Sequence, residues 1–425
     1  MDLLVNSLLK QRTPNGWNLF SSVLLKGIFG CCWLMAIGVQ AQEKNQAIAV
    51  QSNKAWGVID QQGVVLIPLQ YQQAKVLPNA LVLVQQEGKY GLLTLDRREI
   101  IPLEYEKLWP TKKGLFLAKK DGLYGYLKEN GQELLPFVYE GAYPMEENGW
   151  MAVKKQGKWG FVDQQGAVKI PLEYDYVRPL EGPFLPVSKK GKIGLLNQQN
   201  QLVMPMFCDQ VGQYGEGFIA VGRNGVLGYL DEQGQLKIQM IYHQTRAFQE
   251  GMAAVQMQDE WGYIYPSGEI ALPLEYEEAF SFEGGVAKVK KEGQWQLIDP
   301  TGKAISAAYD AMGDLSEGTY WVKKGLKIGY INQQGEVIIP VQYDGNQVRN
   351  FNNGLVAVRE NNSWGYWNEQ GEQVLKAVYE QAGDFSQGLA LVSKQGQKVY
   401  INKKGEWIFE ASELIPDPTI KPIGE

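Results

Sequence analysis

Short runs of alternating hydrophobic and polar residues fill most of the chain, and one run returns at a nearly constant interval. It is clearest in the octet from Trp56 to Gly63, where an apolar stretch is followed by polar residues and a glycine. Equivalent octets begin at Tyr90, Tyr124, Trp159, Ile193, Leu227, Trp261, Trp295, Ile328, Trp364 and Lys398. Steps of 33 to 36 residues throughout the body predict an array of eleven repeats of about 34 residues, with no separate domain.

Each octet predicts a short strand followed by a tight turn. The fifth position is Asp or Asn in eight copies, and the eighth is Gly in all copies except those with Arg97 and Asn200. An Asp or Asn side chain can accept hydrogen bonds from the turn backbone, and Gly tolerates a positive φ. One carboxylate per turn, often replaced by Asn, does not favour calcium binding.

Two more strands complete the predicted repeat. The segment after the turn ends in Pro in seven copies, as at Pro68, and Pro suits a strand end or edge because it lacks an N–H donor. A Tyr usually follows, then a linker and an alternating segment such as 252–255. With no helical periodicity, the unit reads as a three-stranded antiparallel meander.

Such a unit is too small for its own core, so neighbouring units must stack. Trp56 and its equivalents are expected to form the interface, with Gly57 allowing a close backbone approach. An open solenoid or superhelix is favoured, with a closed β-propeller as the alternative, because propellers typically have 4–8 four-stranded blades. The array also opens with the third-strand segment 47–50 and closes with 406–409, so whole units are already present.

The N-terminal residues 1–41 resemble a secretory signal peptide. Positive charge precedes the apolar segment 27–39, and Val39 and Ala41 place small residues at a cleavage site before Gln42. Thirteen apolar residues are too few to cross a bilayer core of about 30 Å.

The leader and the extent of the repeats define the expected organisation and location of the protein. The repeat array would occupy residues 42–415, and a Pro-rich tail at 416–425 would be extended and loosely held. We expect an exported protein of the periplasm, cell surface or extracellular space, with no membrane span after removal of the leader.

Composition excludes several classes of function. A net charge of -6 disfavours nucleic-acid binding, which requires neutralisation of phosphates. In the body, Cys208 is the single cysteine, so we expect a buried thiol and no internal disulfide. The one histidine, His243, cannot form a zinc site or a Cys–His dyad, and no nucleophile elbow is present. We expect no catalytic residues, metal or cofactor, although a glycosidase-type carboxylate pair remains an alternative.

Charged residues repeat at two positions. Lysine pairs stand at 119–120, 154–155, 189–190, 290–291 and 323–324, and acids stand beside the Tyr at Glu106, Glu140, Asp175, Glu277, Asp344 and Glu380. We expect the lysines to protect strand edges and the acids to solvate the opposite edge. The alternative is a basic stripe that binds an anionic glycan or an acidic protein.

Tryptophans outside the first octet position are the candidate binding residues. They are Trp109, Trp150, Trp321, Trp367 and Trp407. An exposed Trp can stack on a sugar ring, whereas a strand Trp is more often half-buried.

The Trp-Gly pairs at 56–57, 159–160, 261–262 and 364–365, each followed by an apolar pair, Asp or Asn and a Gly turn, resemble the bacterial WG-repeat family. The resemblance covers about residues 47–410, with departures such as Gln296 and Val399 in place of the glycine. It implies secretion and a β repeat, and it brings no catalytic residues and no ligand.

The sequence therefore favours a non-catalytic scaffold in the cell envelope that binds a protein partner. A module that binds carbohydrate or cell wall, with a cell-surface glycan as partner, is the second reading. A hydrolase with a carboxylate pair is the third.

Overall fold

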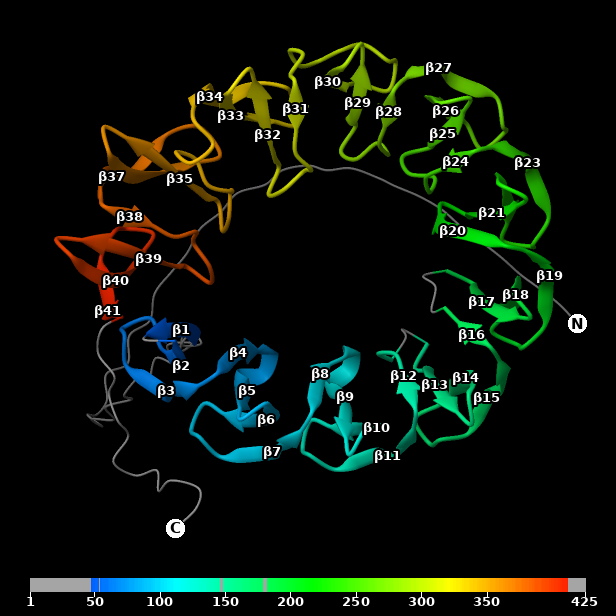
Figure 1. The fold of residues 1–425 in the computed structure, drawn as a ribbon, viewed down its shortest axis with the longest axis horizontal. Helices are drawn as coiled ribbons and strands as arrows, with labels where there is room; N and C mark the ends of the chain where they lie inside the picture. The colour runs from blue at the N-terminus through cyan, green and yellow to red at the C-terminus, as the bar shows by residue number, and fades with distance from the viewer. Residues whose placement is uncertain (1–46, 53, 146–147, 179–181, 412–425) are drawn as a thin grey trace, which may run out of the picture. The chain divides into compact units, whose positions relative to one another are not determined.

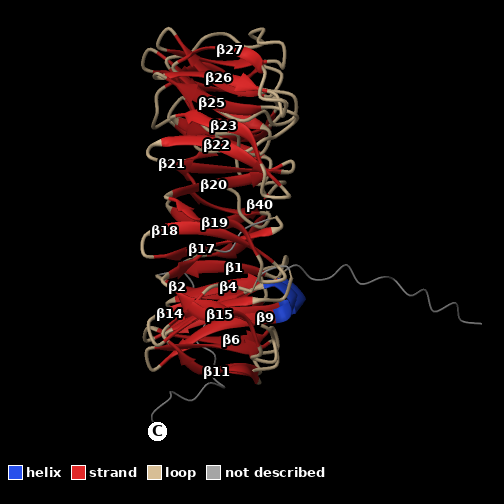
Figure 2. Cartoon of the chain, turned by 90° about the vertical axis from the view of Figure 1, so that its right-hand side faces the viewer, coloured by secondary structure: helices blue, strands red, loops and turns tan. Residues whose placement is uncertain are grey.

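The computed structural model describes residues 47–52, 54–145, 148–178 and 182–411, which all belong to the unit of residues 45–425. The predicted leader (1–41) and Pro-rich tail (416–425) lie outside these residues. The described chain is almost entirely β and forms eleven small antiparallel sheets, which follow one another around a ring (Figure 1). Figure 2 shows strands throughout the wall of this ring, with loops and turns along its two rims.

The strands of the first four sheets are β1 (Ile48–Ser52), β2 (Ala55–Ile59) and β3 (Val65–Tyr71); β4 (Gln73–Leu77), β5 (Leu81–Gln86), β6 (Lys89–Thr94) and β7 (Glu99–Tyr105); β8 (Lys107–Pro110), β9 (Leu115–Lys120), β10 (Leu123–Lys128) and β11 (Glu133–Tyr139); and β12 (Gly141–Ala142), β13 (Met151–Lys155), β14 (Lys158–Val162) and β15 (Val168–Tyr174). Two short 3₁₀ segments, η1 (Pro78–Ala80) and η2 (Lys112–Gly114), precede β5 and β9.

The next four sheets contain β16 (Tyr176–Val177), β17 (Phe184–Lys189), β18 (Lys192–Asn197) and β19 (Leu202–Cys208); β20 (Gln210–Gly215), β21 (Phe218–Arg223), β22 (Val226–Asp231) and β23 (Leu236–Tyr242); β24 (Gln244–Thr245), β25 (Ala253–Met257), β26 (Glu260–Ile264) and β27 (Ile270–Tyr276); and β28 (Glu278–Ala279), β29 (Ala287–Lys291) and β30 (Gln294–Ile298).

The last three sheets contain β31 (Ala311–Met312), β32 (Thr319–Lys324), β33 (Lys327–Asn332) and β34 (Val337–Tyr343); β35 (Leu355–Glu360), β36 (Ser363–Asn368) and β37 (Gln373–Tyr379); and β38 (Gln381–Ala382), β39 (Leu389–Lys394), β40 (Gln397–Asn402) and β41 (Trp407–Glu410).

A fourth strand distinguishes these sheets from the three-stranded unit predicted above. Eight of the eleven sheets described have four strands in chain order, which we call inner, second, third and outer (Figure 1). The inner strand falls in the segment interpreted as a linker, and in β12 and β16 it is two residues long. So short a strand carries no hydrophobic alternation, and it forms only because the second strand offers a free edge. The prediction of three strands per repeat is therefore wrong for most sheets.

The turn predicted from Asp or Asn and Gly is confirmed. In the first sheet, Asp60 Oδ1 accepts hydrogen bonds from the N–H groups of Gln62 and Val64, both at 2.9 Å. Gly63 has a φ of 85°, and the exceptions Arg97 and Asn200 also have positive φ. The side chains of all eight Asp and Asn residues accept the same pair of hydrogen bonds: Asp60, Asp163, Asn197, Asp231, Asp299, Asn332, Asn368 and Asn402.

The glycine of each Trp-Gly pair lies beneath a bulge in the outer strand. Trp159 pairs with Tyr174 but Phe161 pairs with Ile170, so the outer strand has extra residues opposite Gly160. A Cβ on Gly160 would lie 2.5 Å from the carbonyl oxygen of Ile170, a distance that no side chain can accept. The close approach expected of this glycine is real, and it is made by the outer strand of the same sheet.

Hydrophobic clusters join each sheet to the next. Trp261 and Tyr263 of β26 pack with Ala279, Phe282 and Val289 of the following sheet. Trp364 of β36 packs in the same way against the last sheet. The motif tryptophans at these two positions are buried between units, as expected from the sequence.

The first and last sheets also pack together, so the favoured open solenoid is wrong and the chain is an eleven-bladed β-propeller. Ile48, Val50 and Leu69 form one cluster with Leu389 and Phe409. An open array would leave these two apolar end surfaces in water, whereas closure buries each against the other. With the inner strand, the unit becomes a four-stranded blade of the ordinary kind. The number of strands per unit is therefore no argument against a propeller.

Candidate functional site

Successive turns of an up-and-down sheet lie alternately at its two ends, so each rim of the ring collects one kind of turn. One rim, here the hairpin rim, carries the turns between second and third strands together with the junctions from each outer strand to the next inner strand. The other, here the loop rim, carries the turns between third and outer strands and the loops that follow the inner strands.

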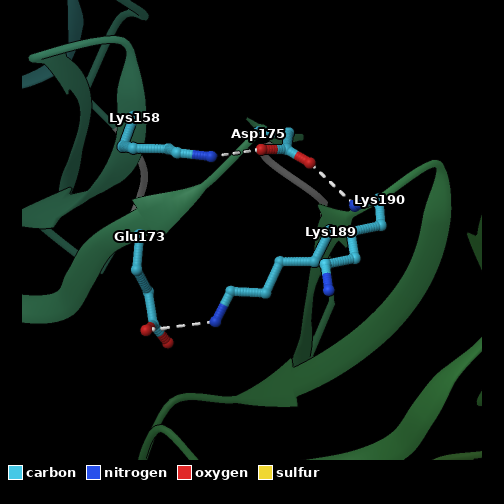
Figure 3. Close-up of polar contacts among 5 residues, drawn as sticks. All are labelled: Lys158, Glu173, Asp175, Lys189 and Lys190. Atoms are coloured by element: carbon cyan, nitrogen blue, oxygen red, sulfur yellow. Dashed lines mark hydrogen bonds and ion pairs between the residues drawn. The ribbon is translucent and has the colours of Figure 1, made fainter.

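On the hairpin rim, the repeated acid caps a hairpin turn. Asp175 follows the outer strand β15, and its Oδ2 accepts a hydrogen bond from the backbone N–H of Lys190 at 2.7 Å (Figure 3). The same contact is made at the turns near Gly122, Gly157, Gly293 and Gly396 by Glu106, Glu140, Glu277 and Glu380. The carboxylates that recur in the sequence therefore hold the rim's hairpins to the outer strands.

The lysine row lies beside these acids and not at the opposite edge. Lys189 Nζ lies 3.0 Å from Glu173, and Lys158 Nζ lies 2.5 Å from Asp175 (Figure 3). Further pairs join Lys119 to Glu106, Lys120 to Glu104, Lys290 to Glu277 and Lys291 to Glu275. The expectation of two separate edges is wrong, because the hairpin turn and the outer-strand junction meet at one rim.

These contacts change the electrostatics of the rim. The ammonium of Lys158 and the Lys190 N–H hold the pKa of Asp175 below its ordinary value. The Gly293 N–H and Lys290 do the same for the pKa of Glu277. Half of the ten lysines in the predicted row have a carboxylate within 4 Å, so the row offers less free positive charge than its sequence suggests.

His243 occupies the place of the repeated acid and performs the same task. Its Nδ1 accepts a hydrogen bond from the backbone N–H of Gln258 at 3.2 Å. The histidine that stood out in the sequence is therefore a turn cap.

The five candidate tryptophans lie on different sheets and form no common site. Trp109 on β8 is 40% exposed and its ring is parallel to that of Tyr124, with centroids 6.4 Å apart. Trp407 on β41 is 50% exposed. Trp150 is half-buried against Phe161, Trp321 covers Gly313, and Trp367 is buried beside Tyr330. Trp109 and Trp407 remain the candidates for ligand contact.

The structure singles out one position on the inner strands that the sequence analysis missed. Here successive blades carry Lys75, Trp109, Tyr143, Arg178, Gly212, Arg246, Phe280, Gly313, Arg349 and Gly383. In five blades the side chain at this position covers the first octet residue of its own blade. The Tyr143 ring lies 4.9 Å from that of Trp159, and the guanidinium of Arg246 lies 5.2 Å from the ring of Trp261.

A regular contact fixes this position, which we call the variable inner position. The hydroxyl of Tyr229 donates to the carbonyl oxygen of Arg246 at 2.7 Å, and Tyr263 donates in the same way to Phe280. Where this bond occurs, the donor is a Tyr at the third octet position, and its partner in these two cases lies 17 residues later. Alignment of the copies at this spacing could have revealed the position, because the residue before it is small or aliphatic throughout.

On the loop rim, a second set of contacts runs from blade to blade. The carboxylate of Glu216 accepts hydrogen bonds from the N–H groups of Glu250 and Gly251, and Glu250 repeats this with Gly284 and Gly285. Glu317 bonds the N–H groups of Asn353 and Gly354 in the same way. This ladder ties neighbouring blades together.

Several other features concern chemistry and location. Cys208 is buried, as expected, and burial raises the pKa of its thiol. Within the described residues, no cluster of three or more His, Cys, Asp or Glu side chains is arranged to hold a metal ion. No helix in the described part of the chain is long and apolar enough to cross a membrane.

Comparison with known families decides the identity of the repeat. A family model described as WG containing repeat matches nine segments, at residues 56–90, 90–124, 124–159, 159–192, 228–260, 261–295, 297–327, 328–364 and 364–397. The chain belongs to the WG containing repeat family. In this WG-repeat protein, the two unmatched copies begin at Ile193 and Lys398, which both lack the aromatic first residue.

Solved structures are similar at low identity. A crystal structure of the eukaryotic initiation factor shares 12% identity, with 78% of this chain and 95% of that chain covered and a TM-score of 0.40. The extracellular domain of a putative one component system from B. thetaiotaomicron shares 10%, covering 86% and 71%, with a TM-score of 0.24. PorZ, a surface component of the type-IX secretion system of Porphyromonas gingivalis, shares 11%, covering 83% and 63%, with a TM-score of 0.24. TM-scores this low carry no functional inference. A comparison with curated proteins gave no match.

Proposed function

We propose that this WG-repeat protein is an exported, non-catalytic scaffold of the cell envelope that binds a protein partner. The observation that carries the proposal is the variable inner position. The same backbone site in successive blades presents aromatic, cationic or glycine residues, on a framework whose other repeated residues hold turns and blades together.

A varied series of side chains on one repeated site suits recognition of a macromolecule. A polypeptide partner can contact several blades at once and match each with different chemistry. Arginine and the aromatic residues are also the types enriched at the centres of protein interfaces. Export is supported by the leader-like residues 1–41, which lie outside the described structure.

Capture from envelope extract tests this function. The chain from residue 42 onward would be immobilised, and captured proteins would be identified by mass spectrometry. We expect a partner whose capture is lost in the double variant Trp109→Ala with Arg349→Ala. The matched control is Val64→Ser, since Val64 is 58% exposed in a turn of the loop rim. Capture that is equal for all three chains would contradict the proposal.

A carbohydrate-binding module is the second candidate, and the exposed ring of Trp109 beside Tyr124 favours it. Flat, partly exposed aromatic rings can stack on sugar rings. Binding on a glycan array that disappears in Trp109→Ala and in Trp407→Ala, with no captured protein, would replace the scaffold by this function.

A further inference from the structure

The fifth blade carries an arginine at the variable inner position without the motif aromatic that accompanies this arginine in other blades. Three blades have arginine at this position: Arg178, Arg246 and Arg349. In two of them the guanidinium covers a motif tryptophan, at 5.2 Å from the ring of Trp261 and at 5.3 Å from that of Trp364. In the fifth blade, the first octet residue is Ile193.

The Arg178 side chain is nevertheless held as its equivalent is held in the seventh blade. Its Nη1 donates to the carbonyl oxygen of Val211, in the inner strand of the sixth blade, at 3.0 Å. The Nε of Arg246 donates at 2.7 Å to the carbonyl oxygen of Ala279, which is the equivalent residue of the eighth blade. The change from tryptophan to isoleucine therefore leaves the anchor of the arginine in place.

A cavity of about 500 Å³ lies beside this arginine, between the fifth and sixth blades. Its lining extends from Arg178 to the hairpin turn at Gly191, on the side of the hairpin rim. Pockets that bind small organic groups have volumes of about 300–1,000 Å³. Besides Gly191, the lining residues are Tyr176, Arg178, Pro186, Val187, Ser188, Ile193 and Val211.

The chemistry of these walls suits an aromatic ring. Ile193, Pro186 and Val211 provide apolar contact, and a buried aromatic side chain removes about 150–250 Å² from water. The guanidinium of Arg178 complements the electron-rich face of a ring, which an aliphatic group does not offer. Ile193 is half-buried, whereas Trp261 and Trp364 are buried beneath their arginines. The equivalent blades thus show which group fills this space.

We propose that the cavity binds an aromatic side chain, tryptophan or tyrosine, of the partner protein. The ring lies against Ile193 and Val211 and beneath the guanidinium of Arg178, in the place that the motif tryptophan takes in the seventh and tenth blades. This inference rests on the proposed scaffold function and names the chemistry of one contact with the partner.

The loop beside Arg178 does not supply such a ring. Residues 179–181 lie outside the described structure, and their sequence, Pro-Leu-Glu, contains no aromatic residue. The partner is therefore the source of the ring to which we commit.

The test uses N-acetyl-5-fluorotryptophanamide as the probe, and fluorine NMR would measure its binding to the chain from residue 42 onward. We expect binding that weakens about fivefold in Arg178→Gln, from the loss of the contact between cation and ring. In Ile193→Trp, whose own ring fills the cavity, we expect binding to be abolished. The Tm of this second variant should rise, because the new ring is buried beneath Arg178.

Ile328→Trp is the matched control. It makes the same substitution in the ninth blade, where the variable inner position is Gly313, and it should leave probe binding unchanged. N-acetyltyrosinamide should displace the probe, whereas N-acetyl-leucinamide, which has no ring, should not.

Three outcomes would overturn the proposal. The probe would bind Ile193→Trp as well as the unaltered chain, N-acetyl-leucinamide would displace the probe as well as N-acetyltyrosinamide does, or binding would strengthen in Leu180→Ala. The last result would make the chain's own loop the occupant. Envelope capture that is lost in the Trp109 and Arg349 double variant but unaffected by Ile193→Trp would leave the scaffold function standing while this site fails.

Discussion

At the scale of single residues, the glycine after the motif aromatic is explained by the neighbouring outer strand. Two exceptions support this. Where Val399 replaces the glycine, the third strand pairs with β41 without the bulge at that point. Where Gln296 replaces it, the blade has no regular outer strand and keeps only isolated bridges, such as Trp295 with Tyr309. The bulge and the glycine therefore occur together.

We predict that Gly228→Ala destabilises the protein by about 1–3 kcal/mol, the usual cost of overpacking. A Cβ there would lie 2.3 Å from the carbonyl oxygen of Ile238. Chemical unfolding would measure the change. Gly345→Ala is the control, because its nearest neighbour would be the Ile328 side chain at 3.4 Å, and a comparable loss in both variants would contradict the steric explanation.

The capping acids predict a dependence of stability on pH. The pKa of Asp175 is lower in the folded protein than its ordinary value of 3.8, because Lys158 and the Lys190 N–H stabilise the carboxylate. Its contribution is therefore complete above that ordinary value and is lost as the pH falls through the lowered pKa.

We expect Asp175→Asn to lower the Tm at neutral pH, with a difference from the unaltered protein that closes as the pH falls below about 4. Thermal unfolding between pH 2 and 7 would check this. Asp121→Asn, a change in the hairpin turn between β9 and β10, should leave the Tm profile unchanged. A difference for Asp175→Asn that grows toward acid pH would exclude the capping role.

At the scale of elements, two kinds of contact hold each blade in place. Acids on the hairpin rim follow an outer strand and cap a hairpin turn of the next blade, and the glutamates of the loop rim cap turns in the following blade from the opposite end of the sheets. Both sets use short-range chemistry at a repeated position, so each is visible in the sequence as a recurring polar residue. Which turn each carboxylate caps depends on how the strands pair in the folded structure.

The loop-rim ladder predicts a local effect that crosses from one blade to the next. In Glu250→Ala, the N–H groups of Gly284 and Gly285 lose their acceptor, and we expect faster amide hydrogen exchange at these residues. Mass spectrometry of exchanged peptides would measure it. Glu292→Ala, which alters an exposed acid of the hairpin rim, should leave the exchange at 284–285 unchanged. Equal rates of amide exchange at 284–285 in both variants would contradict the role of the loop-rim ladder.

At the scale of the whole unit of residues 45–425, closure depends on one seam. Every other pair of adjacent blades is also joined directly by the chain. Among the described residues, the first and last blades meet through side chains such as Leu69 and Phe409 and through the bonds between Tyr400 and the Gln51 backbone. The seam is therefore the place where the ring opens most easily.

We predict that Phe409→Ala, a loss of about 3–5 kcal/mol for a buried aromatic, opens the seam. Sedimentation velocity should report a larger hydrodynamic radius, with the β signal in circular dichroism retained. Phe385→Ala makes the same truncation between the tenth and eleventh blades, which stay connected by the chain, and should lower stability without this expansion. Expansion in neither variant would mean that the seam is not the weak point.

The sequence by itself determined the repeat, its β character and its turns, because these follow from contacts between residues close in the chain. Asp60 and Gly63 specify a turn wherever the fold places it. The same local rules could not reveal the inner strand, which in several blades is too short for hydrophobic alternation, or the pairing of the lysine and acid rows.

Closure of the ring and the cavity between its first and last blades were decided only by the tertiary structure. They depend on the angle between successive sheets, summed over eleven blades, and on contacts such as Gln51 with Tyr400 between residues 349 positions apart. No local pattern specifies the summed angle between the sheets, so the sequence was compatible with both a solenoid and a propeller. Burial of the two end surfaces against each other stabilises the closed ring.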